Sequence, residues 1–109
     1  MKAVPLIGLL LCFGYATTCP AASGQGIWAD QCAQCHGADG KAQTPMGKRR
    51  QIKNFADAKV QADMTDDAMF KAIKDGKKSG AGGTLMPPAE KVTDDDIKAL
   101  MLVVRGFKQ

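Results

Sequence analysis

Apolar residues near the end of the chain recur at a spacing of three or four positions. They are Ile97, Leu100, Met101, Val104 and Phe107. Residues at this spacing share one face of an α-helix. Thr93 and the three aspartates after it are typical of a helix N-terminus, where a hydroxyl caps free N–H groups and carboxylates oppose the helix dipole. The pattern predicts a C-terminal helix that begins after Thr93 and buries one apolar face.

The same signals predict a second helix in the middle of the chain. Thr65 precedes two aspartates, and Met69, Phe70 and Ile73 then supply an apolar face. Gly76 is a suitable end for this helix, because glycine readily takes the positive φ that often follows a helix. We therefore expect a helix that begins after Thr65 and stops at Gly76.

A third helix is expected near the N-terminus. It would begin at Ser23 or Gly24 and continue through Gln34, with Ile27 and Trp28 facing the interior. The predicted helices therefore lie at both ends and in the middle of the chain.

The connections between these helices carry little regular pattern. Residues 37–41 are rich in Gly and Asp and predict a turn. Residues 42–54 lack periodicity and predict a loop, and residues 77–83 predict a flexible loop. No stretch predicts a strand of any length, so the expected fold class is all-α.

The beginning of the chain has the order of a secretory signal peptide. Lys2 gives a positive start, residues 3–16 are almost wholly apolar, and residues 17–23 are mostly small. Small side chains allow cleavage after Ala21 or Ser23, and Ser23 is the position that we favour.

Two alternatives for this segment are weaker. A retained membrane anchor needs about 20 apolar residues, more than the run provides. Lipid attachment at Cys12 or Cys19 needs a small residue just before the cysteine, and neither cysteine has one. We therefore expect a cleaved signal peptide, residues 1–23, and one periplasmic domain, residues 24–109, without stable membrane insertion.

Composition changes this picture in two ways. One Trp, one Tyr and four Phe among 109 residues leave few large side chains to fill the core of a small domain. A large flat cofactor would supply the missing apolar volume. The net charge of +4 falls to +3 when Lys2 is removed. Without a basic stripe or abundant aromatic residues, this charge does not favour nucleic-acid binding.

Cleavage of the leader would leave Cys32 and Cys35 as the only cysteines, and His36 follows them directly. Thiol exchange, zinc binding and covalent haem attachment all use cysteines at this spacing. No βαβ pattern surrounds the pair, as a thioredoxin-like site requires, and a single histidine leaves a zinc site short of ligands. Residues three and four apart share a helix face. The motif therefore favours one haem c, attached through both cysteines, with His36 as an iron ligand.

The second axial ligand has several candidates, because a single histidine excludes bis-histidine ligation within the chain. The methionines after the leader are Met46, Met64, Met69, Met86 and Met101. Met69 and Met101 have the spacing of core residues, and Met64 directly precedes a helix cap. Met86 is the leading candidate, because glycines before it and prolines after it exclude a helix or regular strand and favour a loop. Met46, in another proline-containing loop, is second, and an open iron site is third.

This ordered set of elements resembles the class I cytochromes c, and among them the short bacterial single-haem proteins. The shared motifs are an entry helix at 24–28, CAQCH at 32–36, Leu-Met-Pro at 85–87 and a C-terminal helix at 97–100. The resemblance covers residues 24 to about 107. It implies a cytochrome c fold of three to four helices wrapped around one covalently bound haem.

The resemblance also implies a crossing of the N- and C-terminal helices, with Gly24 and Trp28 at the contact. Val103 stands where an aromatic residue is common in the family, so Trp28 or Phe107 is expected to fill that volume. The family holds its haem histidine through a backbone carbonyl near a loop proline, and Pro45 is the candidate here.

The expected activity is outer-sphere transfer of single electrons between redox proteins, carried out by a monomer that is not an enzyme. Seven cations are expected either to surround the haem edge and attract an acidic partner, or to be merely solvated. They are Lys41, Lys48, Arg49, Arg50, Lys53, Lys77 and Lys78. The alternatives are a peroxidase-like haem catalyst with an open iron site, a gas-binding module, and a haem subunit of a larger dehydrogenase or oxidase.

Overall fold

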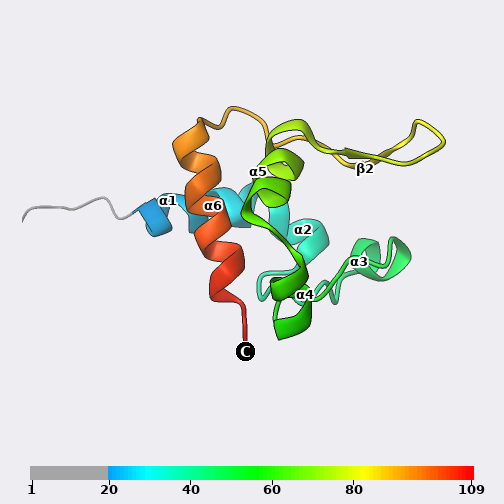
Figure 1. Ribbon diagram of the computed structural model, residues 1–109, viewed down its shortest axis with the longest axis horizontal. Coiled ribbons are helices and arrows are strands. Elements are labelled where there is room, and N and C mark those ends of the chain that lie inside the picture. Colours follow the sequence, from blue (N-terminus) through cyan, green and yellow to red (C-terminus); the bar gives the residue numbers. More distant parts are fainter. Residues whose placement is uncertain (1–19) are drawn as a thin grey trace, which may run out of the picture.

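The computed structural model describes residues 20–109, which are mostly helical (Figure 1). In chain order the elements are α1 Pro20–Ile27, η1 Trp28–Cys32, α2 Ala33–His36, α3 Pro45–Arg49, α4 Ala58–Asp63, α5 Asp66–Asp75, β1 Lys77–Lys78, β2 Thr84–Met86 and α6 Asp94–Gly106. Most of the expected signal peptide lies outside the described residues. Within residues 20–109, no helix is long and apolar enough to cross a membrane.

The expected N-terminal helix is present as a continuous run of α1, η1 and α2. It already includes Pro20 and ends at His36, two residues beyond the expected end. The middle section is a π-helix, in which the N–H of Ala33 donates to the carbonyl of Trp28, five residues back. π-helical turns in α-helices are frequent at functional sites. This π-helical turn ends at Cys32, the first cysteine of the CAQCH motif.

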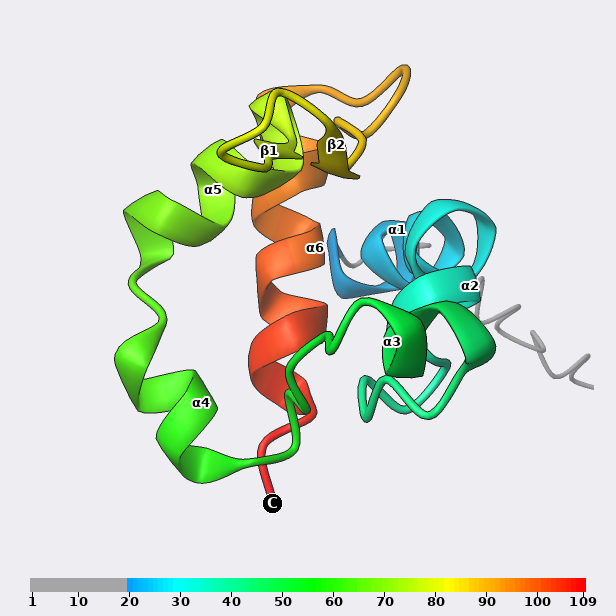
Figure 2. The same ribbon diagram turned by 90° about the vertical axis from the view of Figure 1, so that its right-hand side faces the viewer.

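The N- and C-terminal helices cross as the resemblance implied (Figure 2). A Cβ atom added to Gly24 would stand 2.7 Å from the carbonyl oxygen of Ala99, so α1 and α6 approach this closely only with glycine there. Val103 is buried at the same contact. The rings of Trp28 and Phe107 lie 5.0 Å apart between centroids. Both aromatic residues therefore contribute to the volume beside the crossing.

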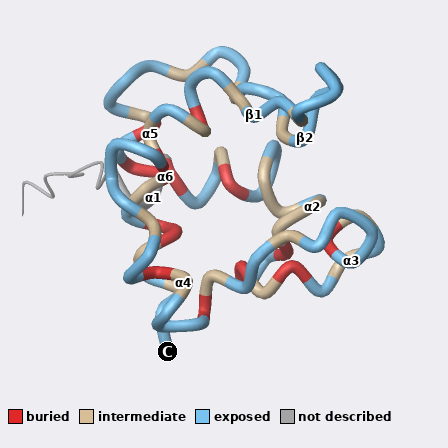
Figure 3. Tube along the Cα trace, turned by 45° about the vertical axis from the view of Figure 1, so that its right-hand side comes forward, coloured by how far each residue is buried: buried red, intermediate tan, exposed pale blue. Residues whose placement is uncertain are grey.

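The hydrophobic core lies between α5, α6 and the π-helical turn (Figure 3). Its buried members are Trp28, Met69, Ile73, Ile97, Leu100, Val103 and Val104. The apolar faces predicted for the middle and C-terminal helices are therefore confirmed. Met69 belongs to this core, and Met101 packs against it.

The predicted helix caps are also confirmed. The hydroxyl of Thr65 accepts a hydrogen bond from the N–H of Ala68, and Gly76 ends α5 with a φ of 74°. At the start of α6, Thr93 and Asp96 form a reciprocal capping box. These local signals give both helices their expected limits, because side-chain oxygens satisfy N–H groups that the helix leaves free.

Two expectations about the connections are wrong, and one helix was not expected. Within residues 42–54, α3 forms because Thr44 caps it and Pro45 occupies its first position. α4, at Ala58–Asp63, was not anticipated. β1 and β2 pair as an antiparallel hairpin, so residues 77–83 are not all loop and Met86 ends a short strand. Elements of two to six residues are too short to show a hydrophobic period.

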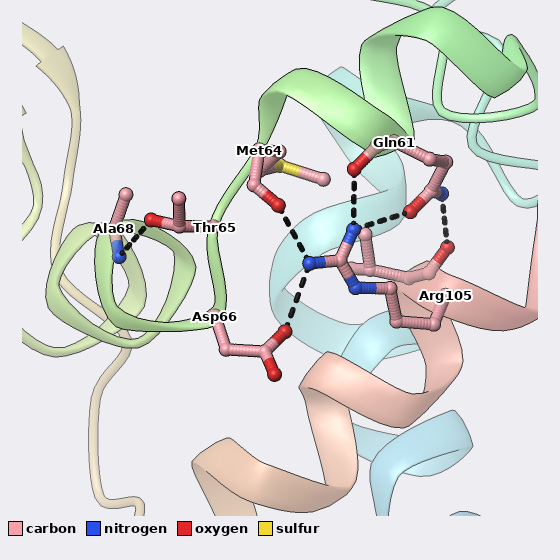
Figure 4. A network of polar contacts seen from close by, with 7 residues as sticks. Gln61, Met64, Thr65, Asp66, Ala68 and Arg105 are labelled. Atoms are coloured by element: carbon pink, nitrogen blue, oxygen red, sulfur yellow. Dashed lines mark hydrogen bonds and ion pairs between the residues drawn. The ribbon is translucent and has the colours of Figure 1, made fainter.

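A polar network fixes α4 and the α4–α5 connection against α6 (Figure 4). The buried amide of Gln61 donates to the carbonyls of Phe55 and Val104. The guanidinium of Arg105 donates to Gln61, to the carbonyl of Met64 and to the carboxylate of Asp66. The network holds α4 and the start of α5 in place on one side of the cavity described next.

Candidate functional site

A cavity of about 660 Å³ lies between the π-helical turn and α2 on one side and α5, α6 and the β2 segment on the others. This size is within the range of small-molecule and cofactor pockets. Much of its wall is apolar, including Ile52, Phe55, Val60, Met64, Met69, Ile73, Leu85, Leu100 and Val104. The small hydrophobic core therefore borders a cavity large enough for a cofactor.

All four residues predicted for the site line this one cavity. Cys32, Cys35 and His36 come from the N-terminal helical run, and Met86 comes from the end of β2. His36 and Met86 are far apart in the sequence, so the tertiary fold alone brings them to the same space.

The structure separates the other methionines by their position. Met46, the second candidate, lines a different pocket with Gln34, Pro45 and Arg49. Met64 and Met69 line the large cavity together with Met86. Met69 was expected to be a core residue from its helical spacing, and Met64 directly precedes the cap of α5. Helical spacing shows which face of a helix is apolar, but it does not show which cavity that face borders.

His36 sits in an aromatic environment. Its ring is stacked on Phe55 at 5.1 Å between centroids and lies 5.5 Å from Trp28. Burial lowers the pKa of His36, because desolvation disfavours the charged imidazolium. The neutral imidazole is also the form that binds a metal.

The expected hydrogen bond from His36 to a backbone carbonyl near Pro45 is not formed. The Nδ1 atom of His36 is buried and has no hydrogen-bond partner among residues 20–109. Instead, the hydroxyl of the neighbouring Thr44 donates to the carbonyl of Cys35 at 2.6 Å. Thr44 thus ties α3 to α2, while Nδ1 remains without a partner.

The Cys32 thiol is not suited to thiol exchange. Burial, with a smaller effect from Cys35, raises the pKa of Cys32 to about 11. Cysteines of thioredoxin-like sites instead have lowered pKa values, because the thiolate is the reactive form. Within the part of the chain that the structure describes, no group of three or more His, Cys, Asp and Glu side chains is placed to hold a metal ion.

Comparison with known protein families matches residues 20–102 to the family described as cytochrome C oxidase, cbb3-type, subunit III. The chain belongs to this family of c-type cytochromes. Its structure is similar to the solved structure of the KustC0563 c-type cytochrome, with a TM-score of 0.67 and 37% identity, covering 79% of this chain and 98% of that chain. A solved mutant of Kustc0563 is similar too, with a TM-score of 0.65, 37% identity and coverage of 79% and 99%. No curated protein matches.

A c-type cytochrome binds its haem covalently, and the residues present fit that group. Two cysteines three positions apart stand on the wall of an apolar cavity, as attachment to one haem edge requires. His36 lines the same wall, so the only histidine of the chain borders the same space as both cysteines of the motif. Cys32 and Cys35 are therefore placed where residues that attach a haem would have to lie.

The cations of the cytochrome divide into two groups. Arg50, Lys53 and Lys77 line the cavity and are exposed, so they lie at its mouth. Asp63 and Glu90 also line it. The other four expected cations, Lys41, Lys48, Arg49 and Lys78, are not among the lining residues. The positive charge next to the cavity is therefore carried by three side chains rather than by seven.

Proposed function

We propose that this cytochrome is a single-haem electron carrier that works outside the cytoplasm, with His36 and Met86 as the axial ligands of its iron. The observation that carries the proposal is the shared cavity. Its wall holds both cysteines, the only histidine and a methionine from the opposite side. A site closed on both faces by protein ligands suits electron transfer, since little rearranges when the iron changes charge.

Haem supplies iron that alternates between the ferric and ferrous states. The residues of the chain set the conditions for that change. Neutral His36 provides a nitrogen donor, and the thioether of Met86 favours the reduced state, which raises the potential. The apolar wall around Met69, Ile73 and Leu100 excludes water and so disfavours the more highly charged ferric state.

The ligand assignment is tested by visible spectra of the purified ferric protein. We expect the weak red absorption band of a sulfur–iron bond in the wild type, and its loss in Met86→Leu. Met46→Leu and Met64→Leu are matched controls and should keep the band, because leucine preserves volume while removing the sulfur. Loss of the band in Met64→Leu alone would show that Met64, and not Met86, is the iron ligand.

The same spectra decide whether the iron site is closed. A wild-type protein without the band, whose ferrous form binds carbon monoxide rapidly, would have an open site. That outcome would favour a peroxidase-like catalyst or a gas-binding module over an electron carrier.

We also propose that the partners are acidic redox proteins that approach the mouth of the cavity. Arg50, Lys53 and Lys77 surround this mouth, where opposite charges accelerate association.

Residues 1–23 are proposed to direct export to the periplasm and to be removed. N-terminal sequencing of the purified protein tests the cleavage, and a start at Met1 would contradict it.

A second candidate function is that of a haem subunit within a larger oxidase. The description of the matching family favours it, since that family is named after subunit III of a cbb3-type cytochrome c oxidase. Gentle purification from the native membrane and periplasmic fractions distinguishes the two. A free carrier is recovered alone, whereas a subunit is recovered with its partner chains.

A further inference from the structure

Gln31 is joined to a distant backbone segment by a pair of hydrogen bonds. Its Nε2 donates to the carbonyl of Glu90 at 2.9 Å, and its Oε1 accepts from the N–H of Glu90 at 2.8 Å. The side-chain amide thus donates one hydrogen bond to the backbone of Glu90 and accepts one from it, as a residue of a neighbouring β-strand would do. Gln31 immediately precedes Cys32, while Glu90 lies four residues after Met86.

Arg50 contacts the same segment on the other side of Met86. Its guanidinium donates to the carbonyl of Thr84 at 3.2 Å and to the carbonyl of Leu85. Arg50 is the C-cap residue of α3, so it belongs to the same half of the molecule as the CAQCH motif. Met86 therefore lies between two anchored points, one just before it and one four residues after it.

These contacts differ from the others that hold the segment of residues 84–90. The N–H of Ala89 donates to the carbonyl of Ile73, and β2 pairs with β1, so these bonds come from α5 and the hairpin. Within the described chain, every hydrogen bond between residues 84–90 and residues 20–55 is made by Gln31 or Arg50. Both side chains line the cavity. Gln31 and Arg50 therefore connect two sides of the cavity, one formed by residues 20–55 and the other by residues 84–90.

We propose that Gln31 and Arg50 are positioning residues that form a clamp, holding residues 84–90 across the cavity so that the thioether of Met86 stays on the iron. The inference rests on the proposed function, in which Met86 is an axial ligand. Both clamp residues are exposed. Their bonds can therefore break without unfolding of the core, and the clamp controls how often the iron becomes accessible to an external ligand.

The clamp is tested on the haem-loaded mature protein with Gln31→Ala and Arg50→Gln. Gln25→Ala and Arg49→Gln are the matched controls, because both residues are exposed and their side chains make no hydrogen bond within residues 20–109. Imidazole binding to the ferric protein reports displacement of the sixth ligand. Loss of two exposed hydrogen bonds should raise the imidazole affinity roughly fivefold to tenfold in each clamp variant, and less than about twofold in the controls.

Two further measurements separate positioning from general destabilisation. The thermal midpoint should change little in the clamp variants, because neither side chain belongs to the core. Gln31→Glu keeps the acceptor for the N–H of Glu90 but loses the donor to its carbonyl, so its imidazole affinity should fall between wild type and Gln31→Ala. An affinity in both clamp variants equal to that of the controls would overturn the proposal.

Hydrogen exchange keeps this test independent of the ligand assignment. The amide protons of residues 84–90 should exchange faster in Gln31→Ala and Arg50→Gln than in the two controls. If Met86→Leu left the ferric spectrum unchanged, the ligand assignment would be wrong, yet the exchange rates would still decide whether the clamp holds the segment. Unchanged exchange beside a normal sulfur–iron band would reject the clamp alone.

Discussion

The two walls of the haem cavity are held in different ways. The α6 wall is buried, with Leu100 and Val104 almost inaccessible to solvent, and it is tied to α4 by the Gln61–Arg105 network. The Met86 wall is a short segment of mostly exposed residues, held across the cavity by the clamp of Gln31 and Arg50. We therefore expect one wall to determine whether the domain is folded, and the other, under the proposed clamp, to control access to the iron.

This difference indicates that stability and iron access can be altered separately. Burial of apolar side chains supplies most of the free energy of folding, and exposed hydrogen bonds add little to it. A change in the α6 wall should act on unfolding, while a change in the Met86 wall should act on spectra and ligand binding. Equivalent substitutions in the two walls should therefore differ in which of these properties they change.

The largest effect is expected for Leu100→Ala. Leu100 is 0% exposed and lines the cavity from α6, so truncation removes a buried side chain and leaves a void. The free energy of unfolding should fall by about 3 kcal/mol. Urea unfolding followed by far-ultraviolet circular dichroism measures it. A fall of less than about 1 kcal/mol would show that the α6 wall is not the packed core of the domain.

A smaller but still large effect is expected for Gln61→Ala. The amide of Gln61 is buried and donates to the carbonyls of Phe55 and Val104, which the variant leaves without their partner. We expect a loss of about 2 kcal/mol in the free energy of unfolding. Gln61→Met keeps most of the volume, so a loss of similar size there would assign the effect to the hydrogen bonds.

Gln43→Ala is the control for this pair. Gln43 is exposed, and its side chain makes no hydrogen bond in the described part of the chain. Its unfolding free energy should stay within about 0.5 kcal/mol of the wild type. An equal loss in Gln43→Ala and Gln61→Ala would mean that the network does not anchor α4.

The helices and the attachment motif could be predicted from sequence because their signals are local. Thr65 and Thr93 cap helices whose apolar residues repeat every three or four positions, and CAQCH holds both cysteines and the histidine within one short stretch. The two short strands and α3 carry no such repeat. They form because Thr44 caps α3 and because β1 and β2 flank a glycine-rich turn.

The features that sequence did not indicate are contacts between distant residues. Gln31 and Glu90 are 59 positions apart, and nothing near either residue shows that the amide of one meets the backbone of the other. Met69 likewise has the spacing of a core residue and Met64 directly precedes a helix cap, although both line the cavity. A hydrophobic pattern gives the direction of a side chain relative to its own helix, while the cavity depends on how several elements come together.

The smallest effect is expected for Leu85→Ala, which applies the change made at Leu100 to the Met86 wall. Both leucines line the cavity, but Leu85 is 50% exposed. Half of its surface remains in water when the protein folds, so the free energy of unfolding should change by no more than about 0.5 kcal/mol. The sulfur–iron band should also remain, because the carbonyl of Leu85 still accepts from Arg50 in the alanine variant. A loss close to that of Leu100→Ala would mean that residues 84–90 are packed as firmly as α6, and the clamp would then be unnecessary to hold Met86 in place.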